Sequence, residues 1–137
     1  MKNYNSVLKF NNYIVNKVEF LNNSNFKANK NGTPINFEIE KPEIEINKNL
    51  MNITLQVKLF ENAQENNYPF EMSISLTGYF ETEGDKPDKF IPNAIAIMYP
   101  YIRAIVSTYT ASANVNPLIL PAININKLIE ETQKEKD

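Results

Sequence analysis

The sequence of 137 residues has no histidine, cysteine or tryptophan, and only three glycines. Without histidine or cysteine there is no imidazole general base, no thiolate nucleophile, no disulfide and no Cys/His zinc site. Gly32, Gly78 and Gly84 lie far apart, so no glycine-rich loop can cradle a phosphate. The serines lie in no nucleophile-elbow motif. We therefore expect no enzyme activity, no metal site and no cofactor.

Other classes of protein are also disfavoured. The sequence has no apolar run of about 18 residues, and its N-terminal stretch has no continuous apolar segment of the signal-peptide kind. The net charge of -2 comes without a basic cluster that could neutralise a phosphate backbone. We expect one cytoplasmic domain over residues 1–137, with no nucleic-acid partner and no direct membrane insertion. The many asparagines fit codon bias in an AT-rich genome.

The first 80 residues have the pattern of strands. Apolar and polar residues alternate strictly in two stretches, which is typical of antiparallel sheets with one buried and one wetted face. Strands are expected at about 13–21, 44–46, 51–59 and 70–80. The apolar positions change from odd to even numbers across Lys41 and Pro42. One flat strand cannot keep both sets on one face, so a crossover segment and a break at Pro42 are predicted.

The stretch 90–125 begins as a helix with apolar residues on two sides, and Arg103 is its only charge. One stripe comprises Ile95, Met98, Ile102, Ile105 and Tyr109; the second comprises Ala94, Ile97, Tyr101 and Ala104. A helix that is apolar on two sides is covered on two sides. One stripe can pack on the sheet of the same chain, and the other is expected to meet another subunit or a ligand. Either stripe could be the core.

The predicted fold class is α+β. It comprises a four-stranded antiparallel, Greek-key-like sheet, with a long two-sided helix and a short C-terminal helix on one face. The strands lie within about 13–80 and the helices within about 91–134. An extended apolar segment separates the two helices, and Asn124 or Asn126 can cap the second one.

Several motifs occur together and in order along this chain. They are Pro42-Glu43-Ile44-Glu45-Ile46, Gly78-Tyr79-Phe80, Pro92-Asn93, Tyr99-Pro100-Tyr101-Ile102-Arg103 and Leu120-Pro121-Ala122. Over about residues 10–132 they resemble the SecB-type protein-export chaperone family. The helix-and-proline block is the specific part of this resemblance.

The resemblance implies a homotetramer, built as a dimer of dimers, in which the first strand pairs across the dimer and the long helices pack between dimers. It implies ATP-independent binding of unfolded polypeptide clients in apolar surface grooves. Carried over residue by residue, the groove comprises Phe26, Phe37, Ile39, Leu118, Ile119, Leu120, Ile123 and Leu128. The oligomer interface comprises Ile95, Met98, Tyr101, Ile102, Arg103, Ile105 and Tyr109. Burial of residues 118–120 against the sheet is the alternative.

The resemblance leaves three functions open. The export branch of the family docks a translocation motor through acidic residues on the first strand, where this chain has Lys17 and Leu21, with Glu19 offset. The leading hypothesis is a general holdase linked to export. The alternatives are a client-specific chaperone of a toxin–antitoxin system and a carrier of an apolar small ligand.

Overall fold

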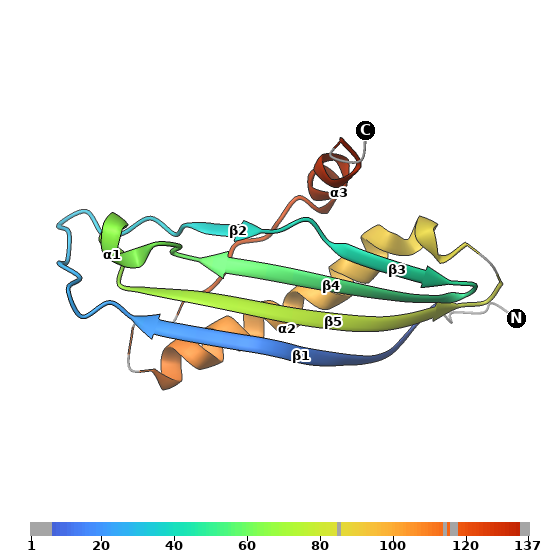
Figure 1. Cartoon of the computed structure of the whole chain (residues 1–137), viewed down its shortest axis with the longest axis horizontal. Coiled ribbons are helices and arrows are strands. Elements are labelled where there is room, and N and C mark those ends of the chain that lie inside the picture. Colours follow the sequence, from blue (N-terminus) through green and yellow to red (C-terminus); the bar gives the residue numbers. More distant parts are fainter. Residues whose placement is uncertain (1–6, 85, 114, 116–117, 135–137) are drawn as a thin grey trace, which may run out of the picture. The chain divides into compact units, whose positions relative to one another are not determined.

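The structure is a computed structural model that describes residues 7–84, 86–113, 115 and 118–134 (Figure 1). It is an α+β fold with an antiparallel sheet, a long helix and a short C-terminal helix, as predicted. The elements in chain order are β1 (Leu8–Asn22), β2 (Phe37–Ile39), β3 (Glu43–Asn47), β4 (Leu50–Leu59), α1 (Ala63–Asn66), β5 (Phe70–Thr82), the 3-10 helix η1 (Pro87–Phe90), α2 (Ile91–Ser112) and α3 (Ile125–Lys134).

The sheet has the strand order β1-β5-β4-β2, and β3 also pairs with β4 (Figure 1). Two short strands, β2 and β3, therefore share the edge beside β4, with the buried Pro42 between them. The predicted break at Pro42 is confirmed. Only one short strand, at 44–46, was predicted there, whereas the crossover before Pro42 also holds the three-residue strand β2.

Contacts divide the chain into two compact units. Unit 1 contains the described residues of 1–13, 44–53 and 78–137, and unit 2 contains residues 14–43 and 54–77. The strands β1, β4 and β5 each continue from one unit into the other. That the whole chain is one domain stays a prediction.

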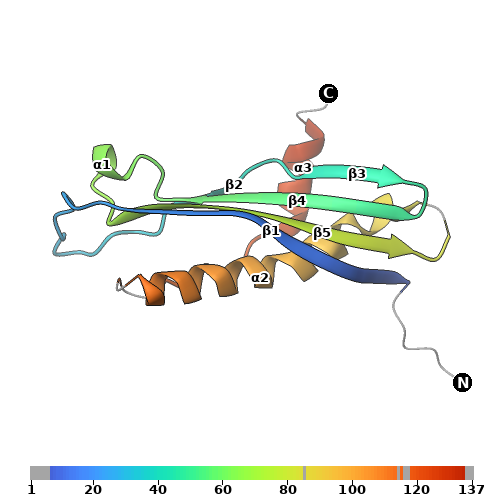
Figure 2. The same ribbon diagram turned by 60° about the horizontal axis from the view of Figure 1, so that its bottom comes forward.

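In unit 1, α2 lies against one face of the strands (Figure 2). Gly78 of β5 allows this close approach. A Cβ atom at position 78 would lie 2.9 Å from the Sδ of Met98 on α2 and 2.8 Å from the ring of Phe80. Both distances are shorter than real Cβ contacts, so a side chain at position 78 would force its neighbours to move.

We expect Gly78→Ala to lower the free energy of unfolding by about 1–3 kcal/mol, the usual cost of overpacking a core. Chemical denaturation measures this. Met98→Ala should cost less in the Gly78→Ala background than in the wild type, because it removes the atoms that the new methyl group meets. Equal costs in the two backgrounds would show that Met98 is not the obstacle.

Residues 87–112 are long and apolar enough, by length and composition, to cross a membrane. In this fold, however, one side of α2 packs in the core. Its side chains at Ile95, Met98, Ile102 and Val106 have no exposed surface. This buried side accounts for part of the apolar composition of the helix.

Candidate functional site

In unit 2, the chain that follows β1 is anchored by a buried asparagine. Asn23 is 5% exposed, and its Nδ2 donates to the carbonyl oxygens of Ala63 at 3.1 Å and Tyr68 at 2.9 Å. Its Oδ1 accepts the N–H of Asn25 at 3.0 Å. These bonds satisfy a buried amide and tie the start of the crossover to the connection between β4 and β5.

A second asparagine, Asn67, holds the same crossover at Lys27, four residues after Asn23. The Oδ1 of Asn67 accepts the N–H of Lys27 at 2.9 Å, and its Nδ2 donates to the Lys27 carbonyl at 3.0 Å. This side chain therefore pairs with the backbone of Lys27 much as a neighbouring strand would. Phe26, a predicted groove residue, is half-buried between these two anchors.

Asn67→Ala and Asn67→Gly should separate two contributions to this anchor. Asn67 has φ 53°, a left-handed conformation that asparagine and glycine tolerate better than alanine. Each lost hydrogen bond costs about 0.5–1.5 kcal/mol, and alanine adds about 1–2 kcal/mol of backbone strain. We expect both variants to speed hydrogen exchange at the Lys27 amide, and only Asn67→Ala to lose the further stability. Unchanged exchange in Asn67→Gly would show that the amide does not hold the crossover.

The short edge strand β2 presents both apolar side chains and backbone groups. The N–H of Glu40 donates to the carbonyl of Gln56 at 2.9 Å. In an antiparallel ladder the bonded positions alternate, so Glu38 is bonded to β4 in the same way, and the backbone groups of Phe37 and Ile39 point toward the open edge. Both of these predicted groove residues are half-buried. An extended peptide can add to such an edge as a further strand.

In unit 1, the extended segment, residues 118–124, runs antiparallel to α2 and is bound to it by side chains. We call these three hydrogen bonds the α2 ladder. Its rungs run from Tyr99 Oη to the carbonyl of Pro121, from Arg103 Nε to the carbonyl of Leu120 at 3.1 Å, and from Ser107 Oγ to the carbonyl of Leu118 at 3.1 Å. Residues spaced by four share one face of a helix, so the donors form a row.

Thr110 adds a fourth hydrogen bond beside the α2 ladder. The buried hydroxyl oxygen of Thr110 accepts the N–H of Leu118 at 3.0 Å. Burial raises the pKa of Tyr99, and the nearby Arg103 guanidinium offsets part of that effect. The Tyr99 hydroxyl therefore stays protonated, as a donor must, at neutral pH.

The segment alternates between exposed and buried side chains. Ile119 is 69% exposed, whereas Leu120 has no exposed surface. Leu118 and Ile123 are half-buried. The sequence left open whether residues 118–120 are buried against the sheet. Leu120 is buried, whereas Ile119 is the most exposed of the predicted groove residues.

The last predicted groove residue, Leu128, is half-buried on α3. The Oδ1 of Asn124 accepts the N–H of Lys127 at 3.0 Å, so Asn124 caps this helix. Asn124 and Asn126 were the two predicted candidates for this cap. α3 contacts α2 within unit 1.

The buried face of α2 differs from the predicted stripe. Ile95, Met98 and Ile102 are buried, but the row continues through Val106 and Thr110. Ile105 is half-buried and Tyr109 is 41% exposed. The predicted stripe repeated every 3.5 residues, whereas a straight α-helix has 3.6 residues per turn, so the buried face drifts along the helix.

Two predicted interface residues have partners inside the chain. Arg103 belongs to the α2 ladder. The ring of Tyr101 lies 4.5 Å from that of Tyr13 and 5.8 Å from that of Phe10, centroid to centroid. Their role in an assembly stays a prediction.

The outer side of α2 has no charge. Its exposed residues are small or uncharged, namely Ala96, Pro100, Ala104, Thr108 and Ala111. The edge strand β1 also exposes apolar side chains, at Tyr13, Ile14, Val15 and Leu21. A long edge strand and an uncharged helix face are both surfaces that another protein chain can cover.

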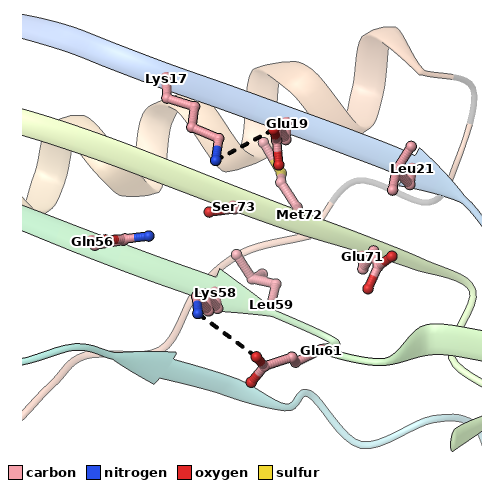
Figure 3. A pocket seen from close by; sticks show the side chains of 10 residues that line it. All are labelled: Lys17, Glu19, Leu21, Gln56, Lys58, Leu59, Glu61, Glu71, Met72 and Ser73. Carbon is pink, nitrogen blue, oxygen red and sulfur yellow. Dashed lines mark ion pairs between the residues drawn. The ribbon is translucent and has the colours of Figure 1, made fainter. Parts of the chain in front are cut away.

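A shallow cavity of about 330 Å³ lies on the half-exposed face of the unit 2 strands (Figure 3). Charged groups dominate its rim. Lys17 pairs with Glu19 at 3.3 Å, and Lys58 pairs with Glu40 at 2.8 Å and Glu61 at 3.7 Å. The hydrogen bond to Glu40 is the main reason that the pKa of Lys58 is raised. Such a lining does not suit an apolar small ligand.

Sequence reasoning missed two groups of functional interest. The α2 ladder had a signal, since Tyr99, Arg103 and Ser107 recur every four residues and so place three donors on one face of a helix. The two anchoring asparagines had none, because they are hidden among many others that codon bias explains equally well.

The chain is similar to known proteins over most of its length. Residues 7–136 match the family model of the preprotein translocase subunit SecB. An uncharacterized protein of Methanocaldococcus jannaschii is 34% identical over an alignment 138 residues long, gaps included. The alignment covers 95% of this chain and 87% of that protein. The protein-export protein SecB of Azoarcus sp. is 24% identical over 96 residues, covering 67% of this chain and 64% of that one.

Two solved structures share the fold. The SecB-like chaperone Rv1957 of Mycobacterium tuberculosis, in complex with a ChAD peptide from the antitoxin HigA1, aligns with a TM-score of 0.62 and 14% identity over 85% of this chain and 88% of that one. A protein of unknown function from Streptococcus agalactiae aligns with a TM-score of 0.51 and 14% identity, over 84% and 97% of the two chains.

Proposed function

Since this chain belongs to the SecB family, a membership that supports a chaperone role, we propose that it is a holdase that binds unfolded polypeptides on apolar surfaces. The observation that carries the proposal is the exposure of Ile119 at 69% on a segment fixed by the α2 ladder. An aliphatic side chain held rigidly in solvent offers a binding surface that needs little ordering when a client arrives.

Unit 2 supports the proposal with a second surface. Phe37 and Ile39 offer apolar side chains together with open backbone groups, and Ile35 beside them is 44% exposed. Backbone hydrogen bonds contribute affinity without reading a sequence. This combination suits unfolded clients, which share a peptide backbone and apolar residues but no common motif. It involves no catalytic step, no nucleotide and no cofactor.

The proposal includes a cytoplasmic homotetramer. Pairing of the β1 edge would form a dimer and bury Tyr13, Ile14 and Val15. The uncharged outer side of α2 would then join two dimers. Each surface is apolar and exposed in the single chain, which is what an obligate interface requires before assembly.

We further propose that this protein delivers its clients for export, and this part of the proposal rests on family membership. Lys17 and Glu19 form an exposed ion pair on β1, so this part of the strand has no net charge for a motor to recognise. Glu71 in the neighbouring strand adds one negative charge to the same face. We expect any contact with a translocation motor to be weak and sensitive to salt.

Light scattering coupled to size exclusion tests the function directly. The protein is measured alone and with an excess of a reduced, unfolded test protein. A mass near four subunits that rises with the client, and suppression of client aggregation, are the expected results. An oligomer that ignores this client and binds only one specific protein would identify a dedicated chaperone instead. A small molecule extracted from the purified protein would point to a carrier.

A further inference from the structure

The extended segment contains three successive aliphatic residues, Leu118, Ile119 and Leu120. Leucine and isoleucine have equal side-chain volume, so exchanging their positions changes the buried apolar area very little. If the segment moved along α2 by one residue, Leu120 and Ile119 would exchange faces, because side chains of an extended chain alternate. Hydrophobic packing alone therefore does not determine which residue faces solvent.

Backbone polar groups do distinguish the two registers. In the observed register, the carbonyls of Leu118, Leu120 and Pro121 each receive a donor from α2. Thr110 accepts the N–H of Leu118. After a shift by one residue, these carbonyls would move away from their donors. These bonds are part-buried, and a donor or acceptor removed from water without a partner is unfavourable, so the loss of several together disfavours the shifted register.

We infer that Arg103 and Ser107, with Tyr99, are positioning residues that set the register of the extended segment and thereby present Ile119, and not Leu120, to the client. This inference deepens the proposed function and rests on it. It gives Arg103 a role inside each subunit, apart from the predicted role of this residue at the oligomer interface. The α2 ladder acts through the backbone, and none of its members needs to touch the client.

The absence of cysteine from the chain makes the register measurable. Ile119→Cys and Leu120→Cys each introduce one unique thiol, whose rate of reaction with a maleimide reports its exposure. In the otherwise wild-type protein we expect the thiol at 119 to react at least 100-fold faster than the thiol at 120. The ratio of the two rates is the readout, because general loosening of the fold raises both rates, whereas a change of register moves them in opposite directions.

Arg103→Met and Ser107→Ala each remove one rung of the α2 ladder. In either background we expect the ratio of rates to fall by tenfold or more, and suppression of client aggregation to weaken several-fold. Ser112→Ala is the matched control for Ser107→Ala, since it also removes a serine hydroxyl group from α2 but at an exposed position at the end of the helix. Ser107→Ala keeps the test valid even if Arg103→Met does not fold.

An unchanged ratio in Ser107→Ala, with the fold intact by circular dichroism, would overturn the inference. A changed ratio with unchanged client binding would also overturn it, because the register would then not matter to the client. The labelling needs no client, so it separates this inference from the proposed function. If the wild type binds no unfolded protein while the labelling ratio responds as expected, the proposed function fails and the register assignment stands.

Discussion

Replacing Ala104 with glutamate is expected to halve the mass of the assembly, from about four subunits to two, while the chain stays folded. Ala104 is exposed in the middle of α2, and glutamate is a good helix former, so the single chain tolerates the change. If the outer side of α2 packs between dimers, the new carboxylate becomes buried without a partner. That costs several kcal/mol, and each 1.4 kcal/mol, roughly, weakens association tenfold.

The measurement is light scattering coupled to size exclusion, with thermal unfolding as a check on the fold. Gln64→Glu is the control. It adds the same charge at an exposed position on α1, in unit 2, and should leave the mass unchanged. If Ala104→Glu has a normal mass and a normal melting temperature, the outer side of α2 is not an interface, and the assembly must be sought at the β1 edge.

Some features of α2 could be predicted from the sequence and others could not. The sequence predicted the long helix, because periodicity and composition are local properties. That its outer side is also covered stays a prediction. The sequence also placed Ile102 in the interface. Ile102 has no exposed surface in the single chain, so a charge there would report unfolding and not dissociation.

The strands were predictable for the same reason, and the exceptions have physical causes. Strict alternation located β4 and β5 to within about two residues of their observed bounds. β1 was predicted to begin at residue 13 but begins at Leu8. Phe10 and Tyr13 both contact the ring of Tyr101 although they lie three residues apart on β1, so the apolar positions shift from even to odd numbers there. Such a shift hides a strand from a search for a period of two.

The candidate site was predictable only in part. The sequence indicated that residues 118–120 are apolar and extended, but it could not separate an exposed Ile119 from a buried Leu120, since the two side chains are chemically alike. That distinction comes from bonds between residues 11 to 22 positions apart in the sequence, between α2 and the segment. Pairings of this range depend on the tertiary fold and leave no periodic signal.

Serine substitutions at these two neighbours should have opposite effects on fold and function. Leu120→Ser removes a fully buried side chain, and such changes cost about 2–5 kcal/mol for the cavity alone. The new hydroxyl needs a partner as well, which adds to the cost when none is in reach. We expect a large fall in the urea midpoint, and in a chain of this size that loss is a major fraction of the total stability of about 5–15 kcal/mol.

Ile119→Ser should leave the free energy of unfolding, measured in urea, within about 0.5 kcal/mol of the wild type, because its side chain is mostly in solvent already. It should nevertheless weaken suppression of client aggregation several-fold, since the apolar area that a client would cover is lost. The comparison is informative because residues 119 and 120 share one segment and one set of backbone bonds, so a difference between them can only come from the direction of each side chain. If Ile119→Ser protects clients as well as the wild type does, the exposed isoleucine is not part of the binding surface. The client would then be held by the edge strand of unit 2, where Phe37 and Ile39 provide the remaining apolar groups.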